Sequence, residues 1–128
     1  MKRVAASLVA VLASISTGCA TLPGIQQSPP ILALDAAAPP ARTADCIVAE
    51  VTQAGEDFSI LRPPWDAPAS QKFGEDYRVL LVAPGGGSAL SEVTVSPAGT
   101  GSRVEVRAKP WDSQAAFLDA VRKCGKAG

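Results

Sequence analysis

Hydrophobic positions recur with helical spacing in two segments of the chain. From Asp45 to Ala54 apolar side chains return every three or four residues, Thr43 or Asp45 can cap the start, and Gly55 supplies a stop. A second segment follows Asp112, which can cap a helix, and ends at Gly125. Its apolar face consists of Ala116, Phe117, Ala120, Val121 and Cys124. The pattern therefore predicts two helices.

Between these segments the pattern is that of β-strands. Residues 77–82 are apolar on both faces, whereas 92–96 and 103–108 alternate apolar with polar side chains. Glycine-containing turns separate these runs, and a further short strand at Phe58–Leu61 fits the same pattern. The order α-β-β-β(-β)-α predicts a small two-layer α+β domain, an antiparallel sheet with both helices on its apolar face.

The start of the chain shows neither pattern. Lys2 and Arg3 precede an apolar run from Val4 to Ile15, and small residues follow it, which is the layout of a signal peptide. A helix that crosses a bilayer needs about 20 apolar residues, more than this run offers. A permanent membrane span is therefore disfavoured.

Residues 21–41 carry five prolines among Ala, Gln and Ser and show no helical or alternating period. This composition predicts an extended tether whose reach, at about 3.1 Å per residue, approaches roughly 60–70 Å. The apolar residues Ile31, Leu32 and Leu34 interrupt the polar run. The alternative for them is docking on the domain.

The chain has three cysteines, Cys19, Cys46 and Cys124. An odd number in an exported protein suggests one pair and one cysteine with another role. Cys46 and Cys124 fall on the apolar faces of the two predicted helices, which makes a disulfide between these terminal helices geometrically reasonable. Two buried free thiols are the alternative, which an oxidising compartment disfavours.

The segment Ser16-Thr17-Gly18-Cys19 resembles the lipobox of bacterial lipoproteins, with Ser16 where Leu is commonest. The resemblance implies a signal peptide at 1–18, lipid on Cys19 and attachment to a membrane through that lipid. Ala20 rather than Asp after the cysteine implies an outer-membrane location facing the periplasm. Cleavage after Ala20 by ordinary signal peptidase is the alternative. The predicted organisation is the signal peptide, a lipidated Pro/Ala-rich tether at 19–41 and the α+β domain at 42–128.

Composition narrows the possible chemistry. The chain contains no histidine, which removes the commonest general base and the commonest metal ligand. Cleavage of the signal removes Lys2 and Arg3 from twelve basic residues, so acidic residues prevail and nucleic acid is not expected as a partner. We expect no catalytic residue, no metal site and no cofactor.

Three further features have structural explanations. Gly85–Gly87 follows an apolar strand but lacks the lysine of a phosphate-binding loop, so a hairpin turn is predicted. The acidic pairs Glu56–Asp57 and Glu75–Asp76 lack the ligand spacing of a calcium loop and are interpreted as solvated charge. Arg103, Glu105 and Arg107, with Glu92 expected on the neighbouring strand, predict a solvated sheet face.

The segment Arg62-Pro63-Pro64-Trp65 is the strongest candidate for a binding site. Trp and Arg are enriched where interfaces concentrate their energy, and flanking prolines reduce the entropy lost on binding. The connection from Arg62 to Phe73 is long for a small domain, and such loops are often functional. The alternative is that Trp65 folds back as a lid on the core, where Trp111 is also expected.

These inferences predict a non-catalytic lipoprotein of the cell envelope. Its role would be protein interaction or assistance to an envelope assembly, with a partner bound at the Arg62–Phe73 loop. The alternative is an inhibitor of a periplasmic enzyme or a small-ligand-binding lipoprotein.

Overall fold

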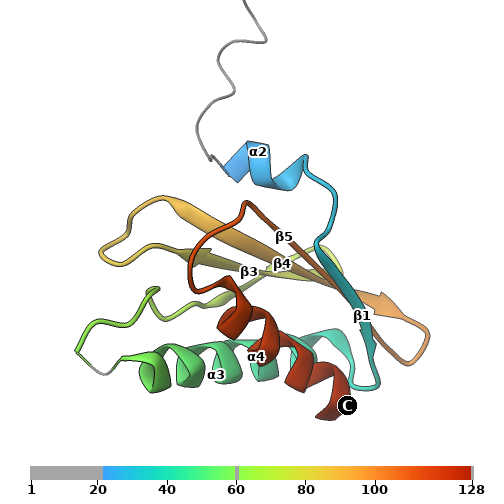
Figure 1. Cartoon of the computed structure of the whole chain (residues 1–128). Coiled ribbons are helices and arrows are strands. Elements are labelled where there is room, and N and C mark those ends of the chain that lie inside the picture. Colours follow the sequence, from blue (N-terminus) through green and yellow to red (C-terminus); the bar gives the residue numbers. More distant parts are fainter. Residues whose placement is uncertain (1–21, 60, 128) are drawn as a thin grey trace, which may run out of the picture.

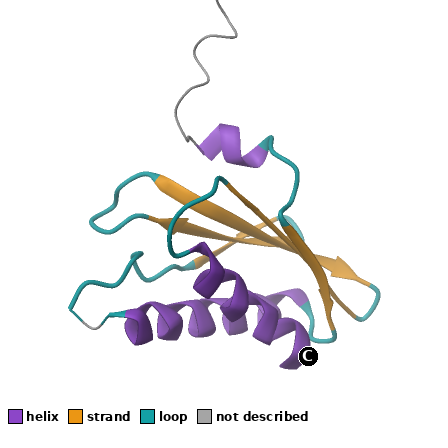
Figure 2. Ribbon diagram, viewed as in Figure 1, coloured by secondary structure: helices purple, strands orange, loops and turns teal. Residues whose placement is uncertain are grey.

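The computed structural model of the protein describes residues 22–59 and 61–127, and its core is a sheet with two long helices on one face (Figures 1 and 2). The elements are, in chain order, α2 (Leu22–Gln26), β1 (Leu32–Ala36), α3 (Pro40–Phe58), β2 (Ser70–Phe73), β3 (Asp76–Val82), β4 (Ala89–Ala98), β5 (Gly101–Ala108) and α4 (Gln114–Ala127). The five strands are antiparallel in the order β1-β5-β4-β3-β2. The predicted α+β class is confirmed.

The core lies between the sheet and the pair α3 and α4. Apolar residues from alternate positions of the three central strands meet apolar residues from one face of each helix. The largest fully buried members are Ile47, Val51, Val79, Leu81, Val93, Val95, Val104, Val106, Phe117 and Val121. Apart from Phe117 and the two tryptophans, this core consists of small and medium side chains.

The predicted strand at Phe58–Leu61 is wrong. Phe58 is the last residue of α3, Leu61 is exposed, and Ile60 lies outside the described residues. The additional strand next to β3 is instead β2, at the edge of the sheet. It pairs with β3 from Ser70↔Val79 to Phe73↔Asp76. Its sequence SQKF holds a single apolar residue, so it gave no alternation to detect.

The prediction of an extended tether at 21–41 is also wrong for the residues that the structure describes. Leu22–Gln26 forms α2, and Leu32–Ala36 forms the edge strand β1, paired with β5. Leu32 and Leu34 pack against the core, as the docking alternative proposed, whereas Ile31 is half exposed. The prolines mark boundaries here, since Pro39 and Pro40 form the start of α3.

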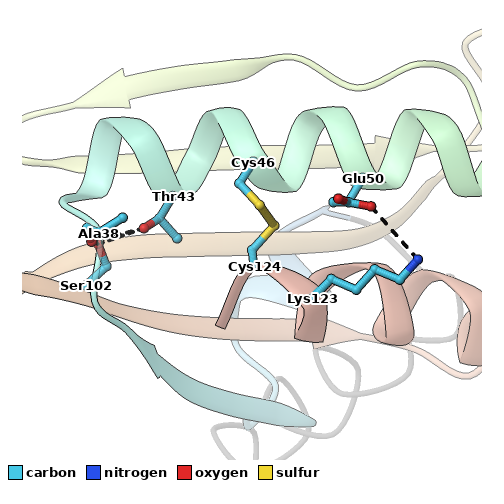
Figure 3. The surroundings of a disulfide bond; sticks show 7 residues. All are labelled: Ala38, Thr43, Cys46, Glu50, Ser102, Lys123 and Cys124. Atoms are coloured by element: carbon cyan, nitrogen blue, oxygen red, sulfur yellow. Dashed lines mark hydrogen bonds and ion pairs between the residues drawn. A yellow bond between two sulfur atoms is a disulfide. The ribbon is translucent and has the colours of Figure 1, made fainter. Parts of the chain in front are cut away.

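The limits predicted for the helices differ from those observed, because the residues expected to cap or stop them make other contacts. Thr43 does not cap a helix but lies buried inside α3, where its hydroxyl donates to the Ala38 carbonyl at 3.1 Å (Figure 3). Gly55 does not end α3, because Trp65 packs on it, and a Cβ there would lie 2.8 Å from Trp65 Nε1. Gly125 lies inside α4 and faces Leu34 in the same manner.

Cys46 of α3 and Cys124 of α4 form the predicted disulfide, with their Cα atoms 5.8 Å apart (Figure 3). The bond joins the two helices where they lie side by side on the sheet. Lys123 Nζ lies 4.0 Å from Glu50 Oε1 beside it, which adds an exposed ion pair between the same helices. The disulfide encloses every element from the middle of α3 to the last turns of α4.

Removal of this bond should weaken the domain strongly. The closed loop spans 78 residues, and the chain-entropy relation assigns a loop of that size roughly 4.5 kcal/mol of stabilisation. We expect Cys46→Ser with Cys124→Ser to lower the free energy of unfolding by roughly 4 kcal/mol, measured by urea denaturation. Reductant should destabilise the parent protein equally and leave the double variant unchanged. Equal stability of the oxidised and reduced protein would contradict this prediction.

Candidate functional site

Trp65 lies in the core rather than in a binding loop, so its predicted role as a partner-binding residue is corrected. It is 2 % exposed, and its indole Nε1 donates to the Val51 carbonyl of α3 at 3.1 Å. Its ring meets Trp111 edge-on at a centroid distance of 5.7 Å and Phe117 at 6.2 Å. The alternative of a lid over the core is correct, because Gly55 leaves a groove on α3 into which the indole fits.

The structure does not bring the five predicted binding residues together. Trp65 is buried on the helix side of the sheet, Pro63 and Pro64 are half-buried beside it, and Arg62 is exposed near the end of α3. Phe73 lines a hollow together with Leu22 of α2, on the other face of the sheet, and its ring is covered by the Arg78 guanidinium at 4.5 Å. The predicted loop is thus divided between a core segment and two separate surfaces.

An exposed apolar corner lies immediately before this loop. Phe58 is 58 % exposed and Leu61 is 94 % exposed, and Arg62 follows them. The Arg62 backbone N–H donates to Ser59 Oγ at 3.2 Å, which folds the segment into a turn. We call Phe58, Leu61 and Arg62 the Phe58 corner. The exposure of Phe58 and Leu61 was not predicted, because the pattern of their segment fits a strand.

A hollow of about 590 Å³ adjoins the Phe58 corner. It is lined by Gln53, Glu56 and Asp57 of α3 and by Ser59 and Leu61 of the turn. Gln53 Nε2 donates to Asp57 Oδ1 at 2.8 Å along the helix surface. The corner therefore combines two protruding apolar side chains with amide and carboxylate groups that remain accessible on its border.

The glycine-rich segment Gly85–Gly87 forms the turn between β3 and β4, as predicted. The backbone N–H groups of Gly85 and Gly86 donate to the two carboxylate oxygens of Asp66 at 3.0 and 2.8 Å. The donors that a phosphate group would need are therefore engaged by a carboxylate of the chain itself. Asp66 thus ties the segment after Trp65 to this turn.

The sheet face opposite α3 and α4 is partly covered, so the prediction of a solvated face is wrong for Glu92. This face, which we call the α2 face, carries α2 in Figure 1. Glu92 is 7 % exposed and accepts a hydrogen bond from Gln26 Nε2 of α2 at 2.9 Å. Arg107 Nε donates to the Ser28 carbonyl at 3.1 Å, and its guanidinium pairs with Glu105 at 3.2 Å. The N-terminal segment supplies these contacts.

A second hollow, of about 410 Å³, lies beside α2 on the same face. Its apolar walls include Leu22, Leu80 and Phe73, and its polar walls include Arg78 and Glu92. Its volume is within the range of small-ligand sites. The hollow therefore offers a cation, a carboxylate and an aromatic ring at one place.

The described residues hold no group of three or more His, Cys, Asp or Glu side chains placed to bind a metal ion. In the same part of the chain, none of the helices is long and apolar enough to cross a membrane. The predicted signal peptide at 1–18 and Cys19 lie outside the described residues. The predictions about export and lipidation therefore stay predictions.

Comparison with known proteins gave no family. No protein-family model matches the chain, and no curated protein matches it. The function is therefore inferred from the residues and contacts described above.

Trp65 should matter for stability. We expect Trp65→Ala to lower the free energy of unfolding by about 3–5 kcal/mol, because a large buried ring is lost. Trp65→Phe should lower the free energy of unfolding by roughly 1–2 kcal/mol, since most of the packing remains and the hydrogen bond to the Val51 carbonyl is removed. Both values can be measured by urea denaturation.

Trp111→Phe is the matched control for the lost hydrogen bond. The Trp111 Nε1 atom is buried, and it has no hydrogen-bond partner among the described residues. Its replacement should therefore cost less than Trp65→Phe. A Trp65→Ala variant as stable as the parent would show that the indole is not part of the core in solution.

Proposed function

We propose that this chain is an exported protein of the cell envelope, anchored in a membrane by lipid on Cys19, with a non-catalytic domain that binds a protein partner. The pairing of the cysteines carries the proposal. Cys46 and Cys124 are bonded to each other, which leaves Cys19 as the third cysteine of the sequence outside this pair. It also occupies the lipidation position of the lipobox-like segment.

The disulfide supports an oxidising location for the domain. Such bonds form and persist in the periplasm and are rare in the cytosol. The bacterial lipoprotein resemblance and Ala20 after the cysteine favour the outer membrane, with the domain in the periplasm. Several acyl chains on one cysteine would give stable attachment, since each buried CH₂ contributes about 0.8 kcal/mol.

The Phe58 corner is the surface best suited to a protein partner. Exposed Phe and Leu side chains offer apolar area, and an adjacent Arg adds directional hydrogen bonds. The segment is attached to a rigid base, because Pro63 and Pro64 lead into the fixed indole of Trp65. Such preorganisation reduces the entropy lost on binding.

A non-catalytic role fits the residues available. The sequence has no histidine, and its two structural cysteines are consumed by the disulfide. The polar groups next to the corner are the carboxylates of Glu56 and Asp57, the amide of Gln53, which donates to Asp57, and the Ser59 hydroxyl, which accepts from the Arg62 N–H. These groups suit hydrogen bonding to a partner better than nucleophilic chemistry.

Binding of a small ligand is the second candidate function. The observation that favours it is the hollow beside α2, where the Arg78 guanidinium stacks on Phe73 and the Glu92 carboxylate lies within the same walls.

An inhibitor role for the domain is a variant of the first proposal, with the Phe58 corner inserted in the cleft of a periplasmic enzyme. The identity of the protein partner distinguishes an inhibitor from an assembly-accessory module, because an inhibitor binds an enzyme.

Acylation tests the anchor. Cells that express the full chain and are fed radiolabelled palmitate should incorporate label into the protein, and Cys19→Ser should abolish both the label and its recovery with membranes. An inhibitor of lipoprotein signal peptidase should cause the unprocessed precursor to accumulate. A processed, unlabelled protein released into the periplasm would instead establish ordinary cleavage after Ala20.

Photo-crosslinking tests the binding surface. A photoreactive amino acid at Leu61 should capture one dominant envelope protein in living cells, whereas the same group at Asp119, an exposed residue of α4, should not. Leu61→Glu should abolish co-purification of that protein while it changes the free energy of unfolding by only about 0.5 kcal/mol, because the side chain is exposed. No capture from a folded, membrane-bound protein would refute the assignment of this surface.

A further inference from the structure

The folded domain begins close to the proposed lipid anchor. α2 starts at Leu22, three residues after Cys19, and three residues of extended chain span at most about 10 Å. With acyl chains on Cys19, the start of α2 lies within about 10 Å of the bilayer surface. We propose that the domain rests on the membrane through its α2 face, an inference that depends on the proposed lipid anchor.

α2 is fixed to the sheet, so it transmits the position of the anchor to the whole domain. Ile25 is fully buried, and Gln26 donates to the buried carboxylate of Glu92. After the helix, the Ser28 carbonyl accepts from Arg107, and the Ile31 N–H donates to the Val106 carbonyl at 2.7 Å. These contacts leave the anchored segment little freedom to turn relative to the domain.

The charge distribution of the chain favours the same orientation. No charged residue occurs between Arg3 and Asp35, so α2 and the turn after it present no charge. Pro23 and Gln26 of α2 and Gln27 of the turn after it are exposed, and they lose no charge hydration when they approach lipid headgroups.

The remainder of this side of the domain is close to electrically neutral. Three arginines stand against four carboxylates on this face, as the strand register places them: Arg78, Arg103 and Arg107 against Asp35, Asp76, Glu92 and Glu105. Attraction to anionic lipid therefore contributes little, and the short connection to Cys19 sets the orientation. The partner of this surface is the bilayer itself, whatever the charge of its headgroups.

The opposite side of the domain then faces the periplasm. α3 and α4 lie beyond the sheet as seen from α2 (Figure 1), and helices with their side chains are about 10–12 Å across. Their exposed positions carry charges of both signs, at Arg42, Asp45, Glu56, Asp119, Arg122 and Lys123. The Phe58 corner, at the end of α3, is thereby presented away from the bilayer.

Fluorescence quenching by headgroup spin-labelled lipid measures this orientation. Single Gln71→Cys and Asp119→Cys variants of the full lipidated chain are labelled with an environment-insensitive dye and placed in phosphatidylethanolamine–phosphatidylglycerol vesicles. Gln71 lines the hollow beside α2, and Asp119 is an exposed residue of α4. Cys46 and Cys124 are bonded to each other, so the introduced cysteine is the reactive thiol. We expect severalfold stronger quenching at position 71 than at 119, unchanged in vesicles without phosphatidylglycerol.

Two variants test whether the short connection between Cys19 and α2 orients the domain on the membrane. Twelve Gly/Ser residues inserted after Thr21 add a flexible connection with an end-to-end distance of about 20 Å, which should reduce quenching at 71 to the level at 119. Ile25→Asp should do the same by releasing α2, because it places a charge at a fully buried position. Vesicle flotation should persist in both variants.

Flotation and quenching together distinguish failure of the orientation from failure of the proposed lipid anchor. A chain that does not float with vesicles lacks the lipid anchor, which refutes the proposed function on which this orientation rests. A chain that floats but shows equal quenching at both positions overturns the orientation and leaves the anchor intact. Quenching at 71 that depends on phosphatidylglycerol overturns the argument that the short connection orients the domain.

Discussion

The disulfide between Cys46 and Cys124 is the constraint on which the rest of the domain depends. It links α3 to α4, the two helices that form one entire layer, and the strands β2 to β5 all lie within the loop that it closes. A domain of this size buries a limited apolar area, and its strand core is mainly valine. A covalent link between the helices therefore replaces stability that a larger core would supply.

The disulfide divides the chain into two parts. The closed part lies between Cys46 and Cys124, and the open part is the segment before Cys46, which the bond does not enclose. α2 and β1 precede Cys46, so hydrogen bonds and packing alone hold them. β1 is nevertheless well fixed, because its ladder with β5 extends from Leu32 to Ala36 and the partly buried Leu34 packs against Gly125. At its end, the Ser102 hydroxyl donates to the Ala38 carbonyl at 2.7 Å, which binds the entry to α3 to the sheet. The open part is thus weakest at α2.

Sequence patterns located the elements that have many apolar residues in a regular period. The central strands and both long helices follow this rule, and the cysteine pairing followed from their apolar faces. β1 and β2 were missed, since each is short and forms only as an edge of an existing sheet. Their formation depends on long-range pairing, which has no local signature.

The candidate site was harder to predict for a related reason. Trp65 has the composition of an interface residue, but the choice between core and surface was decided by Gly55, ten positions earlier, which leaves room for the indole. Glu92 lies at a position where the strand pattern predicts a solvated side chain, but Gln26 covers it from a segment whose composition predicts a tether. The local pattern around Trp65 does not reveal its contact with Gly55, and the local pattern around Glu92 does not reveal its contact with Gln26.

The energetics of α2 connect the fold to the proposed attachment. Ile25 is its one fully buried side chain in the described structure, and such a residue contributes roughly 1.5–3 kcal/mol. Ordering the backbone costs about 1–2 kcal/mol for each of its five residues, so burial of Ile25 alone does not hold α2 in place. If α2 separates, Glu92 gains solvent and faces Arg107 directly across the strands, so its charge is not left buried. The bonds of Gln26 with Glu92 and of Arg107 with the Ser28 carbonyl are therefore needed to keep the anchored segment on the sheet, whereas the disulfide holds the rest of the domain covalently.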